Sequence, residues 1–149
     1  MGRRAMMAWA MLFGLAACDG GSKAADAQET VDDQGEACIV NVDTAPYGTG
    51  VTVQTDAPVT VRAAFDACAP CGDDLQSTCE ITQSGTTLTV TASSSWTPIE
   101  GDCPADCRAW FAECSSGPLP AGTYTLAYGP GSASFDVPSS GTVACAEGN

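Results

Sequence analysis

The most informative absence in this sequence of 149 residues is histidine, which does not occur at all. Catalytic triads and dyads that use histidine as the base, and zinc sites that use it as a ligand, are therefore excluded. Basic residues are scarce as well: five Lys and Arg stand against 18 Asp and Glu, for a formal net charge of −13. Such a chain repels nucleic-acid backbones and anionic lipid, so neither is expected as a partner.

The apolar run near the amino terminus is too short to cross a bilayer as a helix. Residues Ala5 to Ala17 carry no charge, but a helix of this length spans only ~20 Å, against a hydrocarbon core of ~30 Å. The run follows Arg3 and Arg4, and small residues lead from it to Cys18. A positive start, a short apolar region and a small-residue cleavage region are typical of a secretory signal peptide over residues 1–17.

The cleavage region, Leu15 to Cys18 (LAAC), resembles the lipobox of bacterial lipoproteins. The resemblance covers residues 1–18 and implies that Cys18 receives diacylglycerol, that the peptide is cut before it, and that the new amino terminus is acylated with a fatty acid such as palmitate. These chains suffice for stable membrane anchoring in the cell envelope. Asp19 resembles an enterobacterial inner-membrane retention signal, but the membrane and the side on which the domain lies stay open. The alternative is an ordinary secretory signal with an incidental Cys18.

The segment that follows Cys18 is polar and acidic. Residues 19–37 contain six acidic residues and three Gly, and Val31 is their one hydrophobic residue larger than Ala. Such a segment cannot bury enough apolar surface to offset the entropy lost on ordering. Residues 18–37 are therefore predicted to be the lipidated cysteine and a disordered tether, with a short helix over residues 24–30 as the alternative.

Residues 38–149 are predicted to form one all-β domain. They contain 12 Val and Ile but only four Leu, a bias that favours strands. Apolar residues alternate with Thr in Thr87 to Thr91 and in Thr123 to Tyr128, and Ser84-Gly85 is typical of a tight hairpin turn. Similar alternation occurs at residues 38–42, 51–53, 59–65 and 135–137. The pattern predicts a small antiparallel β-sandwich or barrel without helices.

The segment from Leu119 to Pro138 resembles the last two strands of many immunoglobulin-like and fibronectin-like bacterial domains. The whole chain is also similar to cysteine-rich lipoproteins of unknown function in Gram-negative bacteria. These resemblances imply an anchored β-sandwich, immunoglobulin-like or fibronectin-like, and no particular activity.

Cysteine is abundant, and an even number remains once Cys18 is lipidated. Eight cysteines in an exported domain predict four disulfides, which 105 connectivities would satisfy. Two pairs are close in sequence, and we do not expect Cys68 to bond to Cys71 or Cys103 to bond to Cys107. The eight residues are Cys38, Cys68, Cys71, Cys79, Cys103, Cys107, Cys114 and Cys145.

Two other roles for these cysteines are possible. Cys68-Ala69-Pro70-Cys71 has the spacing of a thioredoxin-like redox centre, where a helix N-terminus lowers the pKa of the thiol. Gly72, Asp73 and Asp74 follow instead, and acidic residues would raise that pKa. A zinc site with four thiolate ligands is the second alternative, but export to an oxidising compartment disfavours free thiolates.

The remaining polar candidates carry weak signals. Asp73, Asp74, Asp102 and Asp106 lie in cysteine-rich loops and could supply oxygen ligands to Ca²⁺, although no Asp-x-Asp-x-Asp-Gly run is present. Solvated acids are the simpler interpretation, so no metal or cofactor is predicted. Asp66 could pair with Asp102 as glycosidase carboxylates, but nothing selects this pair. The run of serines at residues 93–95 lacks a base.

The aromatic residues of most interest for binding are Trp96 and Trp110, with Phe111 beside the latter. Exposed rings would stack on a sugar or a peptide, whereas buried rings would fill the core, as Trp does in many sandwiches. Because Trp110 and Phe111 are adjacent, they face opposite sides of any strand, and one of the two is expected outside.

The predicted function is a non-catalytic binding or structural module, lipid-anchored in the cell envelope, whose partner is an envelope protein or a glycan. The alternative is an exported thiol–disulfide enzyme that uses Cys68 and Cys71. Fully paired cysteines favour the module, and free thiols on the folded protein favour the enzyme.

Overall fold

The computed structural model describes residues 27–40, 51–65, 68–99, 108–141 and 144–149, which contain eleven strands and no helix. A membrane-spanning helix is accordingly absent from these residues. The all-β prediction is confirmed. The strands are β1 Glu29–Asp32, β2 Glu36–Val40, β3 Thr52–Val53, β4 Ala57–Ala64, β5 Gly72–Ser84, β6 Thr87–Pro98, β7 Phe111–Leu119, β8 Gly122–Tyr128, β9 Gly131–Val137, β10 Ser139–Ser140 and β11 Cys145–Glu147.

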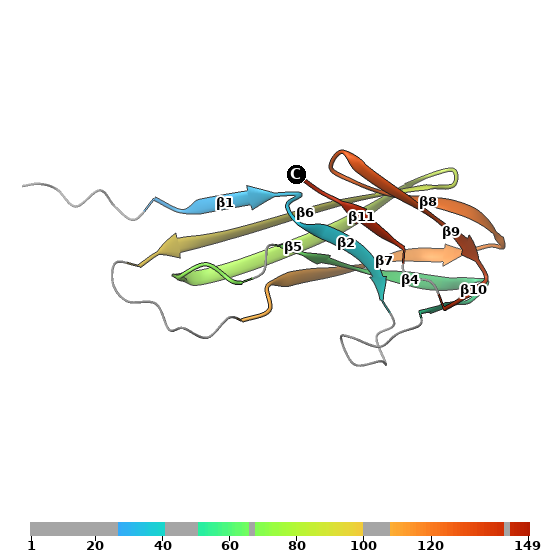
Figure 1. The fold of residues 1–149 in the computed structure, drawn as a ribbon, viewed down its shortest axis with the longest axis horizontal. Coiled ribbons are helices and arrows are strands. Elements are labelled where there is room, and N and C mark those ends of the chain that lie inside the picture. The colour runs from blue at the N-terminus through green and yellow to red at the C-terminus, as the bar shows by residue number, and fades with distance from the viewer. Residues whose placement is uncertain (1–26, 41–50, 66–67, 100–107, 142–143) are drawn as a thin grey trace, which may run out of the picture.

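The strands form two main sheets that pack around one core (Figure 1). In the five-stranded sheet, β5 pairs with one edge of the long strand β6, while β1 and β8 pair with β6 near its two ends, and β9 pairs with β8. The four-stranded sheet has the order β11-β2-β4-β7, and a small two-stranded sheet joins β10 to β3. The predicted β-sandwich is thus present.

One pair of strands departs from the predicted antiparallel arrangement. β6 and β8 run parallel, with Thr87 opposite Thr125 and Val90 opposite Tyr128. The reason lies in the connection, since β7 follows β6 and belongs to the four-stranded sheet. A chain that leaves a sheet and returns to it after one intervening strand can re-enter in its original direction.

The core is built by alternate residues of the central strands, as the sequence pattern predicts. Leu88 and Val90 on β6 are buried, and Thr89 and Thr91, which alternate with them, are exposed. The inward positions of the neighbouring strands follow the same period of two. They include Val59, Val61 and Ala63 on β4 and Tyr124, Leu126 and Tyr128 on β8. Apolar area is therefore removed from water on one face of each sheet.

The crossing from β7 to β8 is fixed by a hydrogen bond across a tight corner. The hydroxyl of Tyr124 donates to the carbonyl of Pro120 over 3.0 Å. This arrangement is similar to the tyrosine corner of immunoglobulin-like sandwiches. It agrees with the resemblance of the segment from Leu119 to Pro138, although β10 and β11 follow, so its strands are not the last ones.

The long hairpin of β5 and β6 extends further than its sequence signals. Ser84 pairs with Thr87 around Gly85, so the predicted turn is confirmed. The strands continue to the pairing of Gly72 with Pro98 and include the Ser- and Pro-rich residues 93–98, which carry no strand signal.

β7 is a second strand that the sequence pattern does not predict, because its inward positions hold small residues rather than a clear apolar alternation.

The amino-terminal boundary of the domain lies earlier than the sequence predicts. Residues 29–37, assigned to the tether, form β1 and the start of β2, and β1 pairs with the end of β6. Val31 packs partly buried against the core. Gly35 has a φ of 76°, and a Cβ there would collide with the carbonyl of Ala64. The tether prediction is wrong for these residues, as is the helix alternative at its C-terminal end, while residues 18–26 lie outside the described part.

The two sheets are joined covalently at the edge formed by β5 and β7. The Cys79–Cys114 disulfide bridges these strands, and the Cα atoms of the two cysteines lie 5.3 Å apart. A second disulfide, Cys38–Cys145, joins β2 to β11 within the four-stranded sheet and so ties the two ends of the domain. The two disulfides close chain loops of very different length, with sequence separations of 35 and 107 residues.

Removal of the Cys79–Cys114 bond as a Cys79→Ala/Cys114→Ala pair should lower the free energy of unfolding by about 4 kcal/mol, and removal of Cys38–Cys145 by about 5 kcal/mol, because each bond restricts the unfolded chain. Urea unfolding monitored by tryptophan fluorescence measures both. The corresponding Cys→Ser pairs, which lose the bond but keep a side chain close to cysteine in size, control for the lost volume. A double variant as stable as the parent would contradict the assigned role of that disulfide.

Candidate functional site

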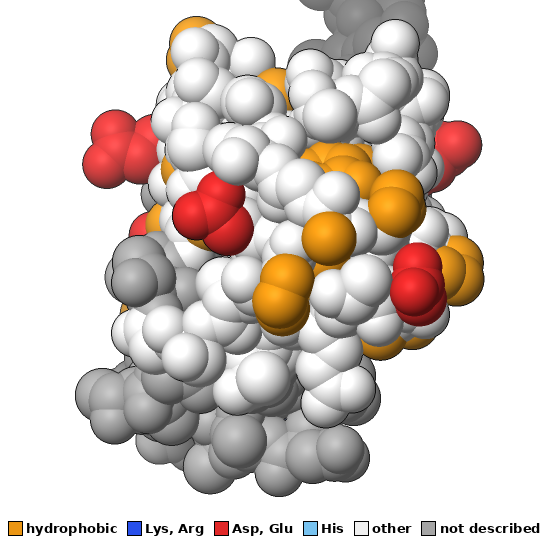
Figure 2. Space-filling view, turned by 90° about the vertical axis from the view of Figure 1, so that its right-hand side faces the viewer, with side chains coloured by type: hydrophobic (Ala, Val, Ile, Leu, Met, Phe, Trp, Pro, Cys, Tyr) orange, Lys and Arg blue, Asp and Glu red, His pale blue; other side chains and the backbone are white. Residues whose placement is uncertain are grey.

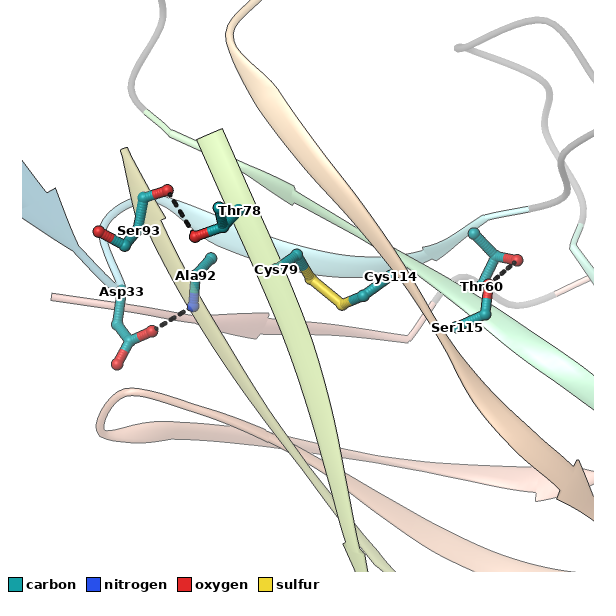
Figure 3. Close-up of a disulfide and its surroundings, with 8 residues drawn as sticks. All are labelled: Asp33, Thr60, Thr78, Cys79, Ala92, Ser93, Cys114 and Ser115. Carbon is teal, nitrogen blue, oxygen red and sulfur yellow. Dashed lines mark hydrogen bonds between the residues drawn. A yellow bond between two sulfur atoms is a disulfide. The ribbon is translucent and has the colours of Figure 1, made fainter. Parts of the chain in front are cut away.

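An open hollow among the described residues lies where the end of β1 meets the middle of the β5–β6 hairpin. Its volume is about 410 Å³. Three acidic residues, Asp32, Asp33 and Glu80, line it together with the hydroxyl-bearing Thr78, Thr91 and Ser93 and parts of Cys79 and Ala92. Figure 3 shows this neighbourhood, with the Cys79–Cys114 disulfide beside it.

Asp33 is held in this hollow by backbone hydrogen bonds on both sides. Its φ of 49° turns the chain at the end of β1. Its carboxylate Oδ1 accepts a hydrogen bond from the amide of Ala92, and its own amide donates to the Ala92 carbonyl, both over 2.8 Å. The Asp33 carbonyl accepts from the amide of Asn149 over 2.8 Å. Asp33 thus continues the pairing with β6 past β1 and joins the amino- and carboxyl-terminal segments.

The buried phenol of Tyr128 stabilises the same turn. Its hydroxyl donates to the carbonyl of Gln34 over 2.8 Å. Burial raises the pKa of Tyr128 from 10.0 to about 12, with a smaller contribution from the negative charge of Asp33. Tyr128 therefore stays a neutral hydrogen-bond donor at physiological pH.

The hollow opens on a sheet face that is rich in hydroxyl groups. The outward positions of β5, β6, β8 and β9 alternate with the core positions and carry mainly Ser and Thr. They include Thr78, Thr82, Thr89, Thr91, Ser93, Ser95, Thr123, Thr125, Ser132 and Ser134. The Thr78 hydroxyl donates to the Ser93 carbonyl at 3.5 Å. Because Ser and Thr side chains are short and the strands are paired, this face presents polar groups on a rigid backbone.

Sequence reasoning missed the three acids of the hollow. Asp32 and Asp33 fell within the predicted tether, and nothing in the pattern distinguished Glu80. The available signal was Val31 before the acids and Gly35 after them, followed by the alternating Ala37 and Ile39, which together describe a strand, a turn and a second strand. Pairing between distant parts of the chain, rather than local sequence pattern, brings Asp32, Asp33 and Glu80 together.

Both candidate binding tryptophans are buried, so the core alternative applies to them. Trp96 and Trp110 are 8% and 7% exposed, and their rings meet edge to face at 5.5 Å. The Trp110 indole N–H donates to the hydroxyl of buried Ser94 over 2.8 Å, and that hydroxyl donates to the carbonyl of Gln76. Phe111 is the outward member of its pair and lies under the Arg62 guanidinium, 4.5 Å from it.

The predicted cysteine and acid sites fall in different places. Cys68 and Cys71 are disulfide-bonded, as are the four cysteines of the two bridges above. Glu36 lies close to Cys38 and Cys145, but a disulfide occupies both sulfur atoms. Asp73 and Asp74 lie at the start of β5, away from the hollow. Cys18, Asp66, Cys103, Asp102, Asp106 and Cys107 lie outside the described residues.

The chemistry that the hollow offers is acceptance and donation of hydrogen bonds by short side chains. Carboxylates and hydroxyls together suit a ligand rich in hydroxyl or amide groups, and the lining described above contains no Lys or Arg to attract an anion. No family model, curated protein or solved structure matches the chain.

The raised pKa of Tyr128 predicts a specific loss of stability in alkali. Since the folded pKa of about 12 lies above the unfolded value of 10.0, the stabilisation is complete below pH 10 and is lost as the pH rises towards 12. Tyr128→Phe removes one hydrogen bond and should lower the free energy of unfolding by about 1 kcal/mol at neutral pH. It also removes the ionisable hydroxyl, so the variant should lose less stability than the parent in alkali. Urea unfolding of both proteins at about pH 8 and about pH 11 measures the difference. An equal alkaline loss in the two would contradict the assignment.

Proposed function

We propose that the chain is a lipid-anchored module of the bacterial cell envelope that acts by binding or by structural support. The observation that carries the proposal is the lipobox-like Leu15 to Cys18 directly after a short signal-like apolar run. In this proposal Cys18 carries the acyl chains and becomes the amino terminus of the mature protein. The membrane itself is then one partner, through the anchor.

The disulfides support export, because such bonds persist in oxidising compartments such as the bacterial periplasm. Cys79–Cys114 and Cys38–Cys145 are both placed to stabilise the fold: one joins the sheets and the other joins the terminal strands. Neither disulfide lies on a flexible hinge of the described structure, since all four cysteines belong to strands. Structural cross-links of this kind suit a domain with a small core.

A binding role is supported by the hollow and the hydroxyl-rich face of the five-stranded sheet. A glycan presents many hydroxyl groups, and an extended peptide presents amides, so both can exchange hydrogen bonds with carboxylates and hydroxyls. The negative charge of Asp32 and Glu80 selects against anionic partners. A neutral glycan or a peptide of an envelope protein is therefore the partner class that fits this surface.

Substitution of the lipobox cysteine tests the anchor. We expect Cys18→Ala to abolish incorporation of a palmitate analogue and to leave the precursor uncut, because the acylated thiol is gone. Metabolic labelling followed by immunoprecipitation measures both effects. Asp19→Ala, which keeps the cysteine, is the matched control and should remain labelled. Label retained on the Cys18→Ala protein would refute the anchoring proposal.

The alternative function is a thiol–disulfide enzyme that uses the Cys-x-x-Cys pair of Cys68 and Cys71. A helix N-terminus after the first cysteine normally lowers the thiol pKa in such enzymes. Here the chain continues from Cys71 directly into the strand β5, which begins at Gly72. The local structure therefore supplies no helix dipole at the second cysteine, which favours a structural role for the pair.

A Cys68→Ser/Cys71→Ser variant separates the two functions. If the pair is structural, the variant should unfold with a free energy lower by about 2–4 kcal/mol for each disulfide lost, and thiol titration should reveal the abandoned partner cysteines. Thermal melting and titration with a thiol reagent under denaturing conditions provide the measurements. A variant that melts like the parent and lacks only a bond that glutathione reduces would favour the enzyme instead.

A further inference from the structure

The described part of the chain exposes three large hydrophobic side chains, and all three lie toward one end of the sandwich. Leu75, Ile99 and Phe111 are 41%, 43% and 42% exposed. Leu75 lies near the start of β5, Ile99 follows β6 and Phe111 begins β7. The start of β5, the end of β6 and the start of β7 lie toward the end from which β1 enters the fold, at the left in Figure 1, which we call the β1 end.

Strand pairing places Leu75 close to the first residue of β1. Glu29 pairs with Trp96 on one side of β6. On the other side of β6, the irregular pairing between Asp73 and Gln76 encloses Leu75 opposite the same stretch. Because neighbouring strands are about 4.8 Å apart, the start of β1 and Leu75 are separated by only two strand spacings.

The other two exposed side chains belong to segments that contact the end of β6 or the start of β5. The ring of Trp110, next to Phe111 in the chain, packs edge-on against the ring of Trp96 at 5.5 Å. Ile99 lies three residues beyond Trp96, and its amide meets the carbonyl of Cys71 beside the start of β5. The backbone at all three positions thus lies at the end where β1 pairs with β6, while the Phe111 side chain points outward from the four-stranded sheet toward Arg62.

The chain that precedes β1 is short. Ten residues lie between Cys18 and Glu29, so these two residues can be at most ~40 Å apart even in a fully extended chain. An anchor at Cys18 therefore keeps the β1 end next to the bilayer. Figure 2 shows the opposite end of the sandwich, where the coloured residues include acids but no Lys or Arg.

We propose that the β1 end docks on the surface of the membrane that holds the anchor, with Leu75, Ile99 and Phe111 in contact with the headgroup and upper acyl region. The proposal rests on the proposed lipidation of Cys18. Apolar side chains of this size gain free energy on leaving water for that region. Leu75 belongs to the long paired strand β5 and Ile99 directly follows β6, so both side chains are held on a rigid backbone.

The charges at the β1 end define the lipid class. Glu29, Asp73 and Asp74 are exposed there against one exposed cation, Arg108, and Arg62, which lies over Phe111, is paired with Glu113 at 2.6 Å. The net negative charge repels an anionic bilayer surface over a distance of about one Debye length. The docking surface therefore fits a zwitterionic bilayer, such as one rich in phosphatidylethanolamine.

Tryptophan reporters at the two ends of the sandwich test the docking on the intact lipidated protein. Phe111→Trp places a reporter at the β1 end, and Thr86→Trp places one in the exposed β5–β6 turn at the other end. Both proteins are reconstituted in phosphatidylethanolamine–phosphatidylcholine vesicles whose acyl chains carry bromine, which quenches tryptophan at short range. We expect the added quenching to be several-fold greater for Phe111→Trp than for Thr86→Trp.

A second variant tests the three side chains themselves. Leu75→Ser/Ile99→Ser/Phe111→Ser, made with the native Trp96 and Trp110 as reporters, should lose several-fold of the brominated-lipid quenching while it melts at the temperature of the parent. Quenching that survives all three substitutions would overturn the proposal. Replacement of part of the lipid by phosphatidylglycerol should weaken the quenching, and added salt should restore it. Stronger quenching on the anionic vesicles would overturn the assigned lipid class.

Flotation of the same vesicles distinguishes the two proposals. Protein that floats with the vesicles but shows equal quenching at both reporters remains anchored without docking, which overturns this inference and leaves the proposed function intact. Protein that does not float refutes the anchor, and the docking falls with it. If the unlipidated chain sediments as a dimer that the triple Ser variant abolishes, the β1 end is an interface between copies, and the lipid assignment is overturned.

Discussion

Cys79 on β5 and Cys114 on β7 are bonded across the edge where the five-stranded and four-stranded sheets come together. The importance of this bond follows from the core that it closes. Six aromatic side chains, among them Trp96, Trp110 and Tyr128, are buried in this core, and most of the other core positions are Val and Ala. The bond adds to this apolar burial by restricting the unfolded chain.

The other edge of β6, where β1 pairs, is held by hydrogen bonds rather than by a covalent bond. Asp33 continues the pairing of β1 with β6, and Tyr128 donates to the carbonyl just after it. The carboxyl-terminal segment closes over the same turn, where Gly148 and Asn149 donate to backbone carbonyls. A pull on an amino-terminal anchor would therefore act on β1, which is fixed to the sheet by hydrogen bonds along its whole length. The hollow lies at the end of β1, one short strand away from the start of β1 at Glu29.

Local sequence pattern was sufficient for those parts of the fold that depend on neighbours in the chain. The buried face of Leu88 and Val90 and the turn at Gly85 follow from alternation and turn chemistry. The hollow could not be predicted, because Asp33 acquires its place only by pairing with Ala92, 59 residues away. The burial of Trp96 likewise depends on Trp110 and Ser94 from across the core. The partners of the cysteines depend on strand register, which spacing alone does not reveal.

The proposed mature chain begins at a lipidated Cys18 and is cross-linked between β5 and β7. Peptide mapping of the protein extracted from membranes, by mass spectrometry without reduction, measures both features at once. The account predicts an acylated peptide that starts at Cys18, one cross-linked peptide that joins Cys79 to Cys114, and another that joins Cys38 to Cys145. An unmodified amino terminus, or Cys79 found as a free thiol or bonded to a cysteine other than Cys114, would contradict it.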